Sequence, residues 1–295
     1  MDWDKLRIFH AVAEAGSFTH AGDSLNLSQS AVSRQISSLE ESLNVSLFHR
    51  HARGLKLTEQ GELLFRTAHE VFAKLAMAEA RIAENREYPE GPLKINTTVA
   101  FGSVWLTTRI KEFIKLYPDV DVSLVLADNE LDLSMREADA AIRMQPPTQP
   151  DLIQRPLMQL RYHLYASPAY IEEMGMPASA PDLDRHRVIV YGRDANPPFA
   201  DLNWVLTVGR EGAPRRPVLQ VNSIYGIFRA VQSGLGIAAL PDYISREVGD
   251  LVRVLPDIDG PPLDVYFVYP AELRDTKRIK VLRDFLVQKI GAEKF

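Results

Sequence analysis

The stretch SQSAVSRQISSLE, residues 28–40, carries the most specific structural signal in the chain. Apolar residues recur here and just beyond at the spacing of an amphipathic helix with one buried stripe. This stripe consists of Val32, Ile36, Leu39 and Leu43. Ser28 is placed to cap the helix, and the opposite face carries short hydroxyl side chains and one positive charge, at Arg34. Short side chains let a helix approach a groove closely, and Gln29 and Arg34 can reach base edges or phosphates. We therefore predict a DNA-recognition helix.

The flanking residues extend this helix to a winged helix-turn-helix. From Trp3 to about Leu47 the pattern is helix, helix, turn, helix, with Gly16 ending the first helix. The next segment, LFHRHARGLKLTEQG (47–61), predicts a short basic hairpin and a new helix start at Thr58, and such a hairpin can hold DNA phosphates. The expected DNA contacts are Ser28, Gln29, Ser30, Ser33, Arg34, Ser37, Ser38, Arg50, Arg53 and Lys56. The alternative is a solvated helix face that is merely rich in serine.

A long helix without proline is expected from Glu59 to about Tyr88. Its apolar residues repeat at alternating spacings of four and three, which is the seam of a coiled coil and predicts a dimerisation helix. The seam residues are Leu64, Ala68, Val71, Leu75, Ala78 and Ile82. The alternative is an ordinary helix packed on its own domain.

The pattern changes after EYPEGP (87–92), whose composition is typical of a hinge. Short apolar runs such as VDVSLVL and IAALP then alternate with helical stretches, including 104–117 and 224–233. This alternation predicts an α/β region with mostly parallel sheets. Its length and the late strand DVYFVYP suggest two lobes joined by crossing strands.

Together these residues resemble the LysR-type transcriptional regulators. The resemblance is carried by AGDSLNLSQSAVSRQISSLE (21–40) and residues 47–61, and more loosely by READAAIR (136–143), LYASPAYI (164–171) and SGLGIAALPDY (233–243). It implies a multidomain chain: an all-α winged helix-turn-helix plus an α/β two-lobed effector domain like periplasmic binding proteins. The expected domains are 1–58 for DNA binding, 59–88 for the linker helix and 89–295 for regulation, with lobe I at about 92–162 and 267–295 and lobe II at about 163–266.

An effector of such a protein is expected between the lobes, where open α/β sheets place their ligands. The junctions TTVAFGS (97–103) and VNSI (221–224) offer hydroxyls at expected helix starts, which suit a small, possibly anionic metabolite bridging Ser103 and Ser223. The alternative is plain helix capping without a ligand. The candidate effector-binding residues are Thr98, Ala100, Phe101, Gly102, Ser103, Asn203, Trp204, Asn222 and Ser223.

Composition restricts the other function classes. The net charge of −5 argues against indiscriminate nucleic-acid coating, and the absence of cysteine excludes disulfides and thiol sensing. The start of the chain, MDWDKLRIFH, lacks a signal-peptide pattern, so we expect a cytoplasmic protein. Known catalytic motifs are missing, and His49 and His51 lie among arginines rather than at a metal site, so no enzyme activity, cofactor or metal is expected.

The expected partners are double-stranded DNA with an interrupted palindrome, a small-molecule effector and a second copy of the chain as a dimer or dimer of dimers. RNA polymerase is a further candidate, and no membrane is expected. A receptor whose only task is to capture a solute is the main rival, and the winged N-terminal segment argues against it.

Overall fold

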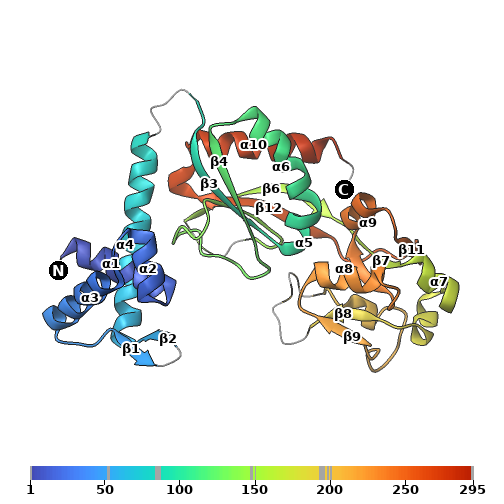
Figure 1. Ribbon diagram of the computed structural model, residues 1–295. Coiled ribbons are helices and arrows are strands. Elements are labelled where there is room, and N and C mark those ends of the chain that lie inside the picture. The colour runs from blue at the N-terminus through green and yellow to red at the C-terminus, as the bar shows by residue number, and fades with distance from the viewer. Residues whose placement is uncertain are drawn as a thin grey trace. The chain divides into compact units, whose positions relative to one another are not determined.

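The chain folds as two compact units, Met1–Ile82 and Ala83–Phe295 (Figure 1). The computed structural model describes residues 2–51, 54–83, 88–146, 149, 151–192, 197, 199 and 201–293. None of the helices in these ranges is long and apolar enough to cross a membrane.

Three helices form most of the N-terminal unit: α1 (Trp3–Ala15), α2 (Phe18–Leu25) and α3 (Gln29–Leu43) (Figure 1). The hydroxyl of Ser28 accepts the backbone N–H of Ala31 at 3.2 Å, so Ser28 caps α3 as predicted. On α3 the side chains of Val32, Ile36 and Leu39 are fully buried. The predicted helix-turn-helix is therefore confirmed, and so is its stripe for these three residues, whereas Leu43 is only partly buried.

A two-stranded antiparallel hairpin follows, formed by β1 (Phe48–His51) and β2 (Gly54–Leu57). The long helix α4 (Glu59–Ala83) begins directly after it. Thr58 joins the two elements, because its Oγ1 donates to the Ser46 carbonyl at 2.7 Å and accepts the Gly61 N–H at 3.0 Å. The N-terminal unit is thus the predicted winged helix-turn-helix, with the two-stranded hairpin as its wing.

Helix α4 uses its apolar residues in two ways. Near its start, Ala68 is buried and Leu64 partly buried against the core of the N-terminal unit, which also contains Phe9 and Leu39. Farther along, Val71, Leu75 and Ala78 are exposed, and the side chain of Ile82 lies outside the described residues. Only the later part of the predicted seam is therefore available to a partner helix, while the first part packs on its own unit.

The first lobe of the C-terminal unit is a five-stranded sheet of order β4-β3-β5-β12-β6. Its strands are β3 (Gly91–Thr97), β4 (Val120–Leu126), β5 (Ala140–Arg143), β6 (Leu152–Leu160) and β12 (Leu263–Pro270). Strand β3 is parallel to β4 and β5, whereas β12 is antiparallel to β5 and β6. Helices α6 (Thr107–Leu116) and α10 (Lys277–Gly291) lie side by side, and the rings of Phe113 and Phe285 are 5.3 Å apart (Figure 1).

The second lobe contains two small sheets. Strands β10 (Ala238–Pro241), β7 (Tyr162–Ala166) and β11 (Val252–Val254) form an antiparallel sheet with β7 in the middle. Strands β8 (Ile189–Tyr191) and β9 (Leu219–Val221) are parallel. Helices α7 (Pro168–Met174), α8 (Ile224–Gln232) and α9 (Asp242–Val248) complete the lobe. The prediction of mostly parallel sheets is therefore wrong here, because strands β7, β10 and β11 pair antiparallel.

Two connections cross between the lobes. Strand β6 ends at Leu160 and β7 of the other lobe begins at Tyr162, and the chain returns between Val254 and Leu263. The expected lobe boundary at residue 266 falls inside β12, which belongs wholly to the first sheet. The late strand itself is confirmed as β12, and the crossing is made by the segment that precedes it. These crossings bring the carboxyl ends of β4, β5, β6 and β8 to one cavity.

Candidate DNA-binding face and inter-lobe cavity

The face of α3 opposite its buried stripe is open to solvent at its amino-terminal half. Gln29, Ser30 and Arg34 are exposed, and among the described residues the Arg34 side chain bonds only back, through Nε, to the Ser30 carbonyl at 3.3 Å. The guanidinium can therefore turn outward without breaking an ion pair. Ser28 is also exposed, while Ser33, Ser37 and Ser38 are partly buried.

One contact on this face involves a lysine that sequence reasoning did not select. Lys5 of α1 donates to the hydroxyl of Ser38 at 2.8 Å, so Ser38 is engaged within the unit and a positive charge lies beside α3. In the hairpin, Lys56 is exposed and lies opposite His49 in the strand ladder. Arg53, and the side chain of Arg50, lie outside the described residues.

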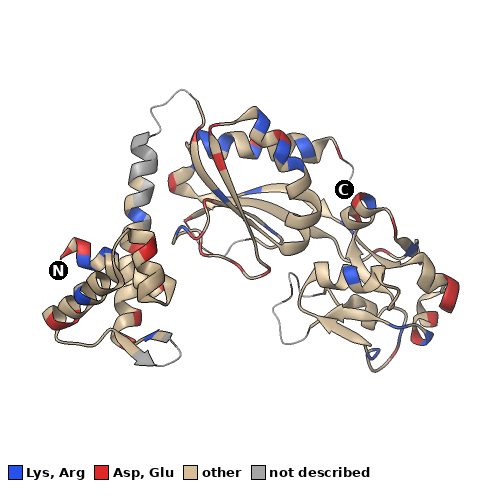
Figure 2. Cartoon of the chain, viewed as in Figure 1, with Lys and Arg blue, Asp and Glu red and all other residues tan. Residues whose placement is uncertain are grey.

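Charge on α3 is arranged along its length. Arg34 is its one basic residue, and Glu40 and Glu41 lie toward its carboxyl end (Figure 2). Glu40 is not free, because its Oε1 accepts the backbone N–H of Leu47 at 2.7 Å. The amino-terminal half of α3 is therefore the half that can approach an anionic polymer.

The N-terminal unit also contains a cluster that sequence reasoning missed. Among the described residues, His10, Glu14 and His69 form the one group whose donor atoms converge, all within 4.8 Å of one another. His10 Nε2 and His69 Nδ1 are 2.9 Å apart, and the His10 ring stacks on Phe65. Such a set could bind a metal ion, but the hydrogen bond between the rings already accounts for both histidines. The helical spacing of His10 and Glu14 was the only signal in the sequence.

This cluster makes the stability of the N-terminal unit depend on pH. Burial lowers the pKa of His10 below its ordinary value of 6.5, Glu14 partly opposes this, and His69 reinforces it. His10 therefore binds a proton more readily in the unfolded chain than in the folded unit. As a result, the stability of the folded unit falls as pH drops below about 6.5. In His10→Phe, this loss between about pH 7 and pH 5 should be smaller than in the wild type. Urea unfolding at several pH values measures it, and equal pH slopes for both proteins would contradict it.

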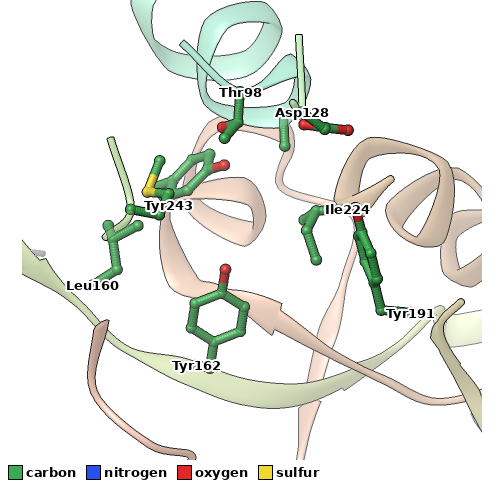
Figure 3. Close-up of a pocket in the computed structure, with 9 residues that line it drawn as sticks. Thr98, Asp128, Leu160, Tyr162, Tyr191, Ile224 and Tyr243 are labelled. Carbon is green, nitrogen blue, oxygen red and sulfur yellow. The ribbon is translucent and has the colours of Figure 1, made fainter. Parts of the chain in front are cut away.

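The C-terminal unit contains a small cavity between its lobes (Figure 3). Most of its lining residues follow strand ends or begin helices, as expected for a ligand site in an open α/β structure. They are Thr98, Ala100, Asp128, Met144, Leu160, Tyr162, Tyr191, Ile224 and Tyr243. A wider cleft shares Thr98, Asp128, Met144 and Tyr191 with this cavity and adds Asn222 and Ser223.

The cavity wall is fixed by the start of the helical segment α5 (Val99–Phe101). Asp128, just after β4, accepts the Val99 N–H at 3.0 Å through Oδ1, and Thr98 is the N-cap residue. The helix therefore starts at Val99, and the prediction that Ser103 opens it is wrong. Gly102 and Ser103 belong to a π-helical turn, Gly102–Leu106, inside the same helical segment.

The candidate effector residues separate into three groups. Thr98 and Ala100 line the cavity, and Asn222 and Ser223 line the wider cleft. Ser103 is exposed and lines neither, so the structure does not bring it together with Ser223.

The remaining candidates act through packing. Asn203 holds the backbone of Tyr191, accepting its N–H at 2.9 Å and donating to its carbonyl at 3.0 Å. Phe101 contacts the ring of Tyr243 edge-on at 5.5 Å. Trp204 packs on the core of the second lobe, and Gly102 allows close approach to Leu126, whose Cδ2 would be 2.2 Å from an added Cβ. These residues support the lining without being part of it.

Sequence reasoning missed most of the lining. Asp128, Met144 and Tyr191 each lie at the end of a predicted strand, so the rule that ligands bind at strand ends could have found them. Tyr162 and Tyr243 had no such signal, because they reach the cavity from the second lobe through tertiary packing.

Comparison with known families identifies both units. Residues 3–62 match the bacterial regulatory helix-turn-helix protein family of lysR type, and residues 86–291 match the LysR substrate binding domain. An HTH-type transcriptional regulator of Xanthomonas campestris is 30% identical over 98% of this chain and 86% of its own length. The HTH-type transcriptional regulator CrgA of Neisseria meningitidis is also 30% identical, covering 98% of this chain and 97% of the relative.

Solved structures of full-length proteins give the same match. CrgA of Neisseria meningitidis, a LysR-type transcriptional regulator, is 28% identical with a TM-score of 0.62 over 99% of both chains. The Vibrio cholerae virulence activator AphB, a member of the LTTR family, is 27% identical with a TM-score of 0.63 over 98% of this chain and 99% of the other.

Proposed function

The chain belongs to the LysR family of transcriptional regulators, which are not enzymes, and from that premise we propose a mechanism in three parts. In this mechanism α3 binds operator DNA and α4 joins two copies of the chain. A small effector between the lobes of the C-terminal unit changes how the dimer binds that DNA. The observation that carries this proposal is the exposed, singly charged face of α3 in a chain that also has an effector-binding domain.

The DNA contact follows from the geometry of helix-turn-helix proteins. A recognition helix enters the major groove with its amino-terminal residues at the base edges, and two copies in a dimer read half-sites of an interrupted palindrome. Gln29, Ser30 and Arg34 are exposed at that end of α3, and Lys56 is exposed on the hairpin. The hairpin then contacts phosphates beside the groove, where basic side chains contribute affinity without sequence preference.

Oligomer formation is proposed through the later part of α4. Val71 and Leu75 are 36% and 44% exposed, which is high for apolar side chains at seam spacing, and Ala78 continues the same stripe. A second α4 helix covering this stripe would bury it. RNA polymerase remains a candidate partner at the promoter, and the cytoplasm is the expected location of a regulator that must reach its DNA.

Effector control is proposed to act through the relative arrangement of the lobes. Arg109 of α6 pairs with Glu247 of α9 in the other lobe at 2.6 Å and with Glu293 at 2.6 Å, so an ion-pair network spans the two lobes. A ligand that binds one lobe arrangement better shifts the population toward it and changes how the DNA-binding pairs are placed. The bridging of an anion by Ser103 and Ser223 is no longer supported, because Ser103 lies outside the cavity.

The first test of this function is selection from genomic DNA. The purified full-length chain should retain fragments that share a palindromic site, and its affinity for them should fall steeply as salt rises. Sequencing of the retained fragments identifies the site. Retention of no common sequence, both with and without a metabolite mixture, would contradict a sequence-specific regulator.

A further inference from the structure

The inter-lobe cavity has a chemical character that restricts its ligand. We propose that the effector carries a positively charged ammonium group, which binds beside Asp128 among the side chains of Tyr162, Tyr191 and Tyr243. This inference rests on the proposed function, because it takes the inter-lobe cavity as the effector site. It reverses the charge that the sequence suggested for the effector.

The first supporting observation is the set of three buried tyrosines. Tyr162, Tyr191 and Tyr243 are 3%, 2% and 4% exposed, and their side chains border the same cavity (Figure 3). Within the described residues, none of the three hydroxyls has a hydrogen-bond partner. These oxygens are not among the described buried polar atoms that lack a partner, so they are open to the cavity and can bond to a ligand or to water.

The second observation is the position of Asp128 relative to these rings. Burial and then the negative charge of Asp128 raise the pKa of Tyr162 and of Tyr191. Burial also raises the pKa of Tyr243, with smaller contributions from Tyr162 and Asp128. The geometric observation beside this is that all three rings line the same cavity as Asp128 (Figure 3).

Asp128 is available to a ligand. It is partly exposed at the cavity, and it accepts a hydrogen bond from the Val99 N–H, a neutral donor. Among the described residues it forms no ion pair. A carboxylate without a cationic partner in a partly closed cavity makes the local potential negative, which attracts a cation and repels an anion.

The chemistry of the wall matches an ammonium ion in three ways. Its N–H groups can donate to the Asp128 carboxylate and to tyrosine oxygens, and its charge is attracted to the faces of the aromatic rings. A carboxylate ligand would instead face Asp128 at short range. A neutral ligand could bond to the hydroxyls but would leave Asp128 without a counter-charge.

The rest of the cavity indicates an apolar body for this ligand. Leu160, Met144 and Ile224 contribute aliphatic surface to the lining. The enclosed space is small, so it suits a compact ligand. The chemical class is thus a small hydrophobic amine.

The basic residue that lines the neighbouring wider cleft already has an acidic partner. Arg143 lines the wider cleft, but it pairs with Glu130 at 3.4 Å and donates to the Leu131 carbonyl at 2.6 Å. Arg143 therefore already has an acidic partner, although its buried Nε has no hydrogen-bond partner among the described residues, whereas Asp128 has no cationic partner among them.

The test is calorimetric titration of the full-length chain with matched compounds. Ethyl, n-butyl and 2-phenylethyl frameworks are each tested with an ammonium, a hydroxyl or a carboxylate group. At least one ammonium compound should bind, and its hydroxyl and carboxylate counterparts should bind at least about tenfold more weakly. In Asp128→Asn, which keeps an oxygen acceptor for Val99, ammonium binding should weaken about ten- to hundredfold.

Two further variants localise the effect. Tyr243→Phe removes one hydroxyl but keeps the ring, so ammonium binding should weaken by less than in Asp128→Asn. Ser103→Ala changes an exposed side chain outside the cavity and should bind the ammonium compound like the wild type. A cooperative thermal unfolding transition in each variant confirms that it is folded.

The outcomes separate the two proposals. Preference for a carboxylate compound, failure of every ammonium compound, or unchanged binding by Asp128→Asn would overturn the inference about charge. None of these results affects the selection of operator DNA. Conversely, ammonium binding by a chain that selects no DNA site would leave the charge inference standing and remove the regulatory function.

Discussion

Replacing Gly61 with alanine is expected to lower the free energy of unfolding of the N-terminal unit by roughly 3 kcal/mol, the upper part of the range for overpacking. Gly61 lies in the first turn of α4, where a Cβ atom would be 2.1 Å from the Leu47 carbonyl oxygen and 3.0 Å from its carbon. These are backbone atoms, so they cannot turn aside as a flexible side chain would. The same carbonyl accepts the Thr58 N–H at 2.9 Å, which fixes it further.

The expected loss of stability in Gly61→Ala is opposite in sign to the effect of helix propensity. Alanine in place of a helical glycine normally stabilises by up to about 1 kcal/mol, so destabilisation at Gly61 would show that the close approach of α4 to Leu47 dominates. Thermal melting should show the transition of the N-terminal unit lowered by about 10 °C or more. DNA binding should be lost with it, while ligand binding by the C-terminal unit should persist.

A matched control is available at the end of α10. In Gly291→Ala the added Cβ meets nothing within 4 Å, so this substitution should leave stability unchanged or raise it slightly. An unchanged melting temperature in Gly61→Ala would contradict the packing argument for the junction between hairpin and α4.

The helix-turn-helix could be predicted from the sequence because its signals are local. Val32, Ile36 and Leu39 repeat at the helical period, and the Ser28 cap lies immediately before them. Both features need only the residues of one helix. The division of α4 could not be predicted, because nothing in its repeat shows that Ala68 packs on its own unit while Leu75 stays exposed.

The cavity was predictable only in part, because most of its lining depends on tertiary packing rather than on local sequence signals. The glycine and serine at 102 and 103 favoured a helix start there, yet the helix begins at Val99, because Asp128 accepts the N–H of Val99 from another strand end. Gly102 is needed inside the helix for its contact with Leu126. The meeting of Tyr162 and Tyr243 depends on how the second lobe packs, which no local pattern encodes.

Arg34→Ala is expected to reduce affinity for the selected operator about 5- to 150-fold, corresponding to roughly 1–3 kcal/mol for a side chain that reads a base. Arg34 is exposed on α3 and forms no ion pair among the described residues, so its loss should not unfold the unit. Alanine is also the best helix former, which makes this variant a clean measure of the contact. Affinity for unrelated DNA should change far less.

Lys56→Ala is the comparison that distinguishes recognition of bases from contact with phosphates. Lys56 is exposed on the hairpin, and a phosphate contact there should contribute equally to all sequences. Its removal should weaken operator and unrelated DNA alike and reduce the slope of log affinity against log salt by about one. Fluorescence anisotropy across a salt series measures both variants. If Arg34→Ala instead weakened all sequences equally, Arg34 would be a phosphate contact, and base recognition would have to come from Gln29 and the serines beside it.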